Sequence, residues 1–210
     1  MTFPSPNPTL DKTTPAPPPP PLPSTTSGSI SNTEKALHPP TVTQTGPLGA
    51  LMVELLIYNG HPFKDHWAYW VCSRTSSHHG VKIHATGDVR NGFKFEVKRS
   101  LDLRTREETP TKRVPLQWVD GQYFDEKSMF NGGQYTIDDV PVCRFESSAY
   151  KIGAPGKSLN TTGDRIVEGT VGKRVIQRDC QTWIVESAEQ LAMDGIFSVK
   201  SVDYLRTIRQ

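Results

Sequence analysis

The sequence predicts an α+β domain in which a mainly antiparallel β-sheet packs against helices. From residue 51 to residue 119, segments that are apolar, aromatic-rich or alternating follow one another between turns rich in Gly, Pro and polar residues, which is typical of strands. From residue 138 onward, apolar residues recur at spacings of three and four, which is typical of amphipathic helices. Strands that come first and helices that follow favour this class over the alternating order of a parallel sheet.

The first 48 residues differ in composition from the rest of the 210-residue chain. Thirteen of the 18 prolines, but only four Asp, Glu, Lys or Arg residues, lie between Met1 and Pro47. Such a segment buries too little apolar surface to offset the entropy lost on ordering. We therefore predict a disordered, partly polyproline-II tail over residues 1–48, serving as a spacer or as a ligand for a proline-binding module. The folded domain is predicted over residues 49–210.

Charge and composition exclude several classes of function. The formal net charge is +2, and Lys and Arg are interleaved with acidic residues, so a nucleic-acid partner is not expected. No apolar run approaches the roughly 18 residues that would predict a membrane span, and no secretory signal precedes the domain. Three cysteines, Cys72, Cys143 and Cys180, favour a reducing compartment over a disulfide framework. We expect a soluble, cytoplasmic protein.

Five strands are expected in the first part of the domain. Each is bounded by Gly or by a polar loop, and the fifth contains Pro115, which favours a position near the edge of the sheet. The expected strands are Leu51–Asn59, His66–Cys72, Val81–Thr86, Gly92–Leu101 and Arg113–Val119.

Three helices are expected in the second part. The first is capped by Asp138 or Asp139 and ends at Gly153. The second covers Asp179–Asp194, with Asp179 as N-cap and Gly195 at the C-terminal end. The last is a short helix over Val202–Ile208. The apolar stripe of the second helix is formed by Cys180, Trp183, Ile184, Ala188 and Leu191.

One cysteine and two histidines are the candidates for chemistry. Cys180 lies in the first turn of a helix, where unpaired N–H groups and the helix dipole favour a thiolate. His66 and His84 lie on adjacent expected strands. A histidine facing the thiol can accept its proton and later protonate the leaving group, while a second polar residue orients the first. Asp88 and His79 are alternatives to His84 in that second role.

Three short motifs resemble those of the circularly permuted papain-like enzymes: HWAYWV from His66, IHATGD from Ile83 and DCQTW from Asp179. That group includes lecithin:retinol acyltransferase, related phospholipid acyltransferases and, more loosely, NlpC-type peptidases. The resemblance extends from about Leu51 to Leu191 and also covers fungal proteins of the same layout. It implies a papain-like (NlpC-like) fold with His66 as base, His84 as orienting residue and Cys180 as nucleophile. Asp179 replaces the Asn usual before the cysteine.

These residues predict a cysteine hydrolase or acyltransferase that acts on an unidentified amide, ester or thioester of a small molecule or peptide. No cofactor and no metal are expected, and Cys72 and Cys143 are assigned to packing. One alternative is a papain-like binding or scaffold protein that has lost activity. Another is a metal-binding β-rich protein, because five histidines lie close together in the sequence: His61, His66, His78, His79 and His84.

Overall fold

The computed structural model describes residues 1–2, 38–105, 108–158 and 177–210. The chain divides into two units between Lys35 and Ala36, and all the elements below belong to the second unit. Most of the predicted tail, residues 3–37, lies outside the described residues.

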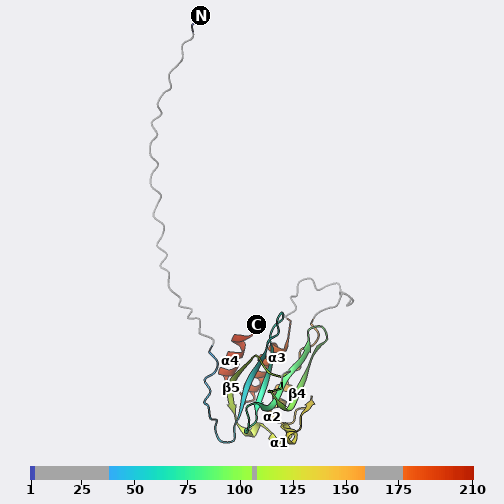
Figure 1. The fold of residues 1–210 in the computed structure, drawn as a ribbon. Coiled ribbons are helices and arrows are strands. Elements are labelled where there is room, and N and C mark those ends of the chain that lie inside the picture. Colours follow the sequence, from blue (N-terminus) through green and yellow to red (C-terminus); the bar gives the residue numbers. More distant parts are fainter. Residues whose placement is uncertain (3–37, 106–107, 159–176) are drawn as a thin grey trace. The chain divides into compact units, whose positions relative to one another are not determined.

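A six-stranded antiparallel sheet forms the centre of this unit (Figure 1). Its spatial order is β5-β1-β2-β3-β4-β6, and each neighbouring pair is antiparallel. The edge position of β5 agrees with the presence of Pro115, which cannot donate a ladder hydrogen bond. The strands are β1 (Leu51–Tyr58), β2 (His66–Cys72), β3 (His79–Asp88), β4 (Gly92–Asp102), β5 (Lys112–Val119) and β6 (Thr136–Asp138).

Four α-helices are present in the described residues, and together with the sheet they confirm the α+β class. Only the last two exceed two turns. The helices are α1 (Glu126–Met129), α2 (Arg144–Tyr150), α3 (Cys180–Met193) and α4 (Val199–Ile208).

The two faces of the sheet carry separate apolar clusters, because side chains alternate along each strand. The larger cluster lies between the first face and helices α2 to α4 and includes Tyr69, Trp183 and Leu205. Tyr69 Oη donates to Ile184 O at 2.7 Å and lies 3.0 Å from Ser187 Oγ, so it joins β2 to α3. The smaller cluster, on the second face, consists of Leu56, Ala68, Trp70, Cys72, Leu101 and Leu103.

The helix expected from Asp138 or Asp139 begins later, with Cys143 as N-cap. Asp138 instead lies in β6, where it pairs with Val97 of β4, and its carboxylate accepts a hydrogen bond from Arg99 Nε at 3.0 Å. Arg99 also binds both oxygens of Glu146, in α2. These ion pairs hold residues 136–138 in the sheet. The helix signals in the local sequence give no indication of the ion pairs.

The helix expected over Asp179–Asp194 is confirmed as α3. Asp179 is its N-cap, and its carboxylate accepts from Thr182 N at 2.8 Å. Gly195 follows the helix with a φ of 74°, a left-handed conformation that glycine adopts without strain. The last helix begins three residues before the expected start, because Ser198 caps it by accepting from Ser201 N.

Residues 38–48, which composition assigns to the tail, are described by the structure, and part of this stretch lies against β5. Trp118 Nε1 donates to Thr43 O at 2.9 Å. Gly46 approaches the Trp118 ring so closely that a side chain at this position would overlap it.

Candidate thiol and histidine site

The N-terminal turn of α3 meets the sheet where β2 and β3 separate. The ladder between these strands runs from Tyr69 to Cys72, whereas β1 pairs with β2 as far as His66. Beside the start of β2, which is paired with β1 but not with β3, the Cys180 thiol lies 3.9 Å from Asp65 O and accepts a hydrogen bond from the Trp67 backbone N–H. The sulfur therefore contacts the backbone on both sides of His66.

The side chain of His66 is the first member of a hydrogen-bonded chain that crosses three strands. His66 Nε2 lies 2.8 Å from His84 Nδ1, and His84 Nε2 lies 3.2 Å from Glu96 Oε1. His84 and Glu96 are directly opposite each other in the β3–β4 ladder. The structure thus brings His66 and His84 together and adds Glu96, which was not among the candidates.

The carboxylate at the end of this chain determines which ring nitrogens carry protons. An ionised Glu96 accepts a hydrogen bond, so neutral His84 carries its proton on Nε2 and accepts through Nδ1. His66 must then donate from Nε2, which leaves the lone pair of its Nδ1 free to accept a proton.

Burial keeps both histidines neutral. Desolvation, helped by the nearby His84, Lys82 and Lys98, lowers the pKa of His66 to about 3. Desolvation also lowers the pKa of His84. The hydrogen bond from His84 lowers the pKa of Glu96 to about 2, so this carboxylate is ionised at neutral pH.

The Cys180 thiol is protonated in this environment. Burial raises its pKa, the charge of Asp179 raises it further, and the Trp67 N–H opposes both effects. Among the described residues, no hydrogen bond joins the sulfur of Cys180 to a ring nitrogen of His66. The expected Cys180–His66 bond is therefore not formed: the His66 side chain projects from the second face of the sheet, with Ala68 and Trp70, whereas α3 packs against the first face.

The segment that precedes β2 is held by side chains from the C-terminal part of the chain. Gln181 Nε2 donates to Asp65 O at 2.8 Å, and Gln210 Nε2 donates to Asp65 Oδ2 at 3.1 Å. The Gln210 backbone N–H in turn donates to Gln181 Oε1 at 2.9 Å. Because Asp65 O is also the oxygen that the Cys180 thiol contacts, these bonds fix the position of the thiol relative to β2.

Comparison with known proteins gives one match. A model for a family of unknown function, DUF6540, matches residues 53–198. The chain belongs to the DUF6540 family. The matched range contains His66, His84, Glu96 and Cys180. No curated protein and no solved structure matches the chain.

The alternative orienting residues of this DUF6540 chain lie elsewhere. His79 stacks against Phe130, with ring centroids 6.2 Å apart. Asp88 is exposed and accepts from Asn91 and Arg90 in the β3–β4 turn. Neither contacts His66 in the described structure, so Glu96 occupies the position next to His84.

The described residues also bear on the metal-binding and membrane alternatives. They contain no group of three or more His, Cys, Asp or Glu side chains arranged to hold a metal ion. In the same parts of the chain, no helix combines the length and apolarity needed to cross a bilayer.

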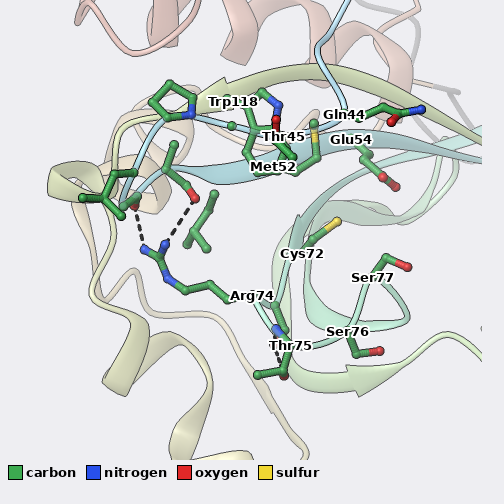
Figure 2. Close-up of a pocket in the computed structure, with 17 residues that line it drawn as sticks. Gln44, Thr45, Met52, Glu54, Cys72, Arg74, Thr75, Ser76, Ser77 and Trp118 are labelled. Atoms are coloured by element: carbon green, nitrogen blue, oxygen red, sulfur yellow. Dashed lines mark hydrogen bonds between the residues drawn. The ribbon is translucent and has the colours of Figure 1, made fainter.

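A separate groove of about 600 Å³ lies at the opposite end of β2 (Figure 2). Arg74 holds one of its walls by donating to Gly49 O and Ala50 O. Cys72 lies in the groove near Arg113, which is paired with Glu54 at 2.7 Å. Burial and the charge of Glu54 raise the pKa of Cys72 to about 12, so this thiol is protonated at neutral pH.

Proposed function

We propose that this DUF6540 protein is a cysteine-dependent hydrolase or acyltransferase with a permuted papain-like fold. Cys180 is the nucleophile, His66 the general base, and His84 and Glu96 orient His66. The observation that carries the proposal is the chain His66–His84–Glu96, which leaves an unprotonated ring nitrogen on the residue whose flanking backbone groups contact the Cys180 thiol.

In the resting site the thiol and the imidazole are both neutral and lie on different sides of β2: Cys180 begins α3, which packs on the first face, whereas the His66 ring contacts Tyr58 and His84 on the second face. Catalysis therefore requires a rearrangement at the start of β2, in which Sγ of Cys180 exchanges its contact with Asp65 O for one with Nδ1 of His66. Active-site hydrogen bonds of this kind are often long until substrate is bound. As Sγ attacks the substrate carbonyl carbon, Nδ1 takes the thiol proton. The imidazolium is stabilised through His84 by the carboxylate of Glu96.

The reaction then proceeds through a thioester. The carbon–leaving-group bond breaks, and His66 returns its proton to the leaving amine, alcohol or thiol. Water or an acceptor nucleophile attacks the thioester carbonyl and gives its proton to His66; the carbon–sulfur bond then breaks, and His66 passes that proton to the departing sulfur, which restores the Cys180 thiol. The first N–H groups of α3 have no carbonyl partner within the helix; the side chain of Asp179 accepts that of Thr182, and those of Cys180 and Gln181 are directed at the Cys180 sulfur. The N–H groups of Cys180 and Gln181 can therefore stabilise the oxyanion.

A papain-like binding protein without turnover is the second candidate. The raised pKa of Cys180 and the missing Cys180–His66 bond favour it. The two candidates share one fold and differ in whether Cys180 can be activated.

Covalent labelling separates the candidates. A chloroacetamide probe should alkylate Cys180 faster than the buried Cys143, as measured by peptide mass spectrometry. General-base assistance is worth roughly 100-fold or more, so His66→Gln should slow labelling of Cys180 by at least about tenfold, with a smaller effect of Glu96→Gln. Cys143, whose pKa burial raises to about 11, is the internal control. Labelling at Cys180 that is no faster than at Cys143 and insensitive to His66→Gln would contradict catalysis and favour the binding protein.

A further inference from the structure

Two lysines on the second face of the sheet share one carboxylate. Lys82, in β3, binds Oε2 of Glu108, and Lys98, in β4, binds Oε1. The exposed fractions of the three side chains are 5% for Lys82, 16% for Lys98 and 15% for Glu108. Both oxygens of a single carboxylate are thus held between two ammonium groups that are largely removed from water.

This cluster lies close to the candidate base. Lys82 Nζ lies 5.1 Å from the ring centroid of Tyr58, and that ring lies 5.9 Å from the ring of His66. Tyr58 Oη also donates to Glu108 O at 3.3 Å. The lysine pair is therefore separated from His66 by about the width of one aromatic ring.

The charges in the cluster do not balance. Two ammonium groups face one carboxylate of their own. Among the described residues, the charge of Glu96 also acts on Lys98, but Glu96 is bonded to His84 and lies 3.5 Å from Lys94. Partly buried positive charge favours an anion, because few water molecules screen it. Glu108 comes from the connection between β4 and β5, not from a strand, so the lysine positions are set by the sheet and do not depend on Glu108.

We propose that Lys82 and Lys98 form an anion subsite that Glu108 fills in this structure and that a carboxylate of the acyl substrate takes over. This inference rests on the proposed function and narrows its substrate class to amides, esters or thioesters that carry a carboxylate near the reacting carbonyl. A carboxylate is favoured over a phosphate because the carboxylate of Glu108 already places one oxygen at each lysine.

Acetate tests the subsite without any need for catalysis. Glu108→Ala removes a group equal to acetate, so acetate at matched ionic strength should raise the melting temperature of this variant more than it does for wild type. The control Glu126→Ala, which removes an equal charge beside the exposed Arg74, should not respond. Adding Lys98→Met to Glu108→Ala should abolish the effect. Equal responses in all these proteins would overturn the subsite. Phosphate, added in place of acetate, should give a smaller shift; an equal or larger one would contradict the carboxylate preference.

A pair of probes tests the link to substrate. At Cys180 in the wild type, N-chloroacetylglycine should label faster than its uncharged amide, and Lys98→Met should reduce this ratio by at least fivefold. The ratio at Cys143 should not change. If Cys180 reacts with both probes but the ratio is insensitive to Lys98→Met, the substrate assignment is wrong. If Cys180 reacts with neither while acetate still acts on Glu108→Ala, the proposed function fails and the anion subsite stands.

Discussion

Lys64 Nζ lies 3.0 Å from Asp179 Oδ2, one residue before the candidate nucleophile. Burial alone would raise the pKa of Asp179, but the Thr182 N–H and Lys64 outweigh it and lower that pKa. Asp179 is therefore ionised, and its charge contributes to the raised pKa of Cys180. Lys64, in the segment between β1 and β2, offsets part of this charge. It therefore partly compensates for the presence of Asp179 where the permuted papain-like enzymes have an uncharged Asn.

Asp179→Asn should make Cys180 more reactive. Asparagine caps helices about as well as aspartate, so α3 should persist while the negative charge is removed. The apparent pKa of Cys180, measured from the pH dependence of its alkylation, should fall by up to about one unit, a tenfold gain in thiolate. Lys64→Met should move the pKa in the opposite direction. The same apparent pKa in all three proteins would show that Asp179 does not control the thiol.

Stability should decrease as the pH falls below neutral. The pKa of His66 is about 3 in the folded protein, against an ordinary value of 6.5. Between these values the unfolded chain binds a proton that the folded protein does not, so folding loses stability as the pH falls through this window. Glu96, whose pKa is about 2 against 4.5, extends the loss to lower pH. In urea denaturation, the free energy of unfolding of His66→Gln should change less between pH 6.5 and 4.5 than that of the wild type. The same change in both proteins would contradict the low pKa of His66.

Tyr69→Phe should destabilise the domain by about 1–2 kcal/mol. The change removes a buried hydroxyl that bonds Ile184 O and Ser187 Oγ, and it leaves the Ser187 hydroxyl without that partner. Tyr150→Phe, at a half-exposed tyrosine, is the matched control and should change the free energy of unfolding by less than about 0.5 kcal/mol. Equal effects in urea denaturation would argue against the buried hydrogen bonds.

Arg99→Met should destabilise the protein strongly. Arg99 and Glu146 are both buried, and removing one partner leaves an unpaired charge, at a cost of about 3–5 kcal/mol. The double variant Arg99→Met with Glu146→Gln should recover part of this loss, because no unpaired buried charge remains. Thermal denaturation of the single and double variants measures the difference. A double variant less stable than Arg99→Met alone would contradict the unpaired-charge account and show that the Glu146 carboxylate matters more through its other contact, with the Val142 N–H.

The elements that depend on local signals could be predicted from the sequence. Alternation and turn residues identify the five longer strands, and Asp179 and Gly195 mark both ends of α3. The strand β6 and the late start of α2 could not be predicted, because they depend on Arg99 binding Asp138 and Glu146 across the chain.

The candidate site was predicted only in part, because some of its residues are marked by local patterns and others depend on contacts between strands. Two histidines on adjacent strands indicate a pair, and the structure places them in contact. Glu96 was missed because Lys94, Glu96 and Lys98 form a polar alternation that is typical of a solvated face. Counting back from the turn that pairs Asp88 with Gly92 would have placed Glu96 opposite His84. The orientation of the Cys180 sulfur depends on the separation of β2 from β3, which no sequence pattern indicates.

Because Trp118 contacts the stretch around Thr43 and Gly46, its fluorescence can report whether this stretch is in place. Because the indole N–H is bonded to Thr43 O and the ring lies beneath Gly46, emission from Trp118 depends on whether this stretch is in place. A protease that digests the chain inward from Met1 should pause before Thr43, and digestion beyond that point should shift the emission to longer wavelength. The useful boundary for a trimmed domain is therefore before residue 43, not at the change in composition near residue 48.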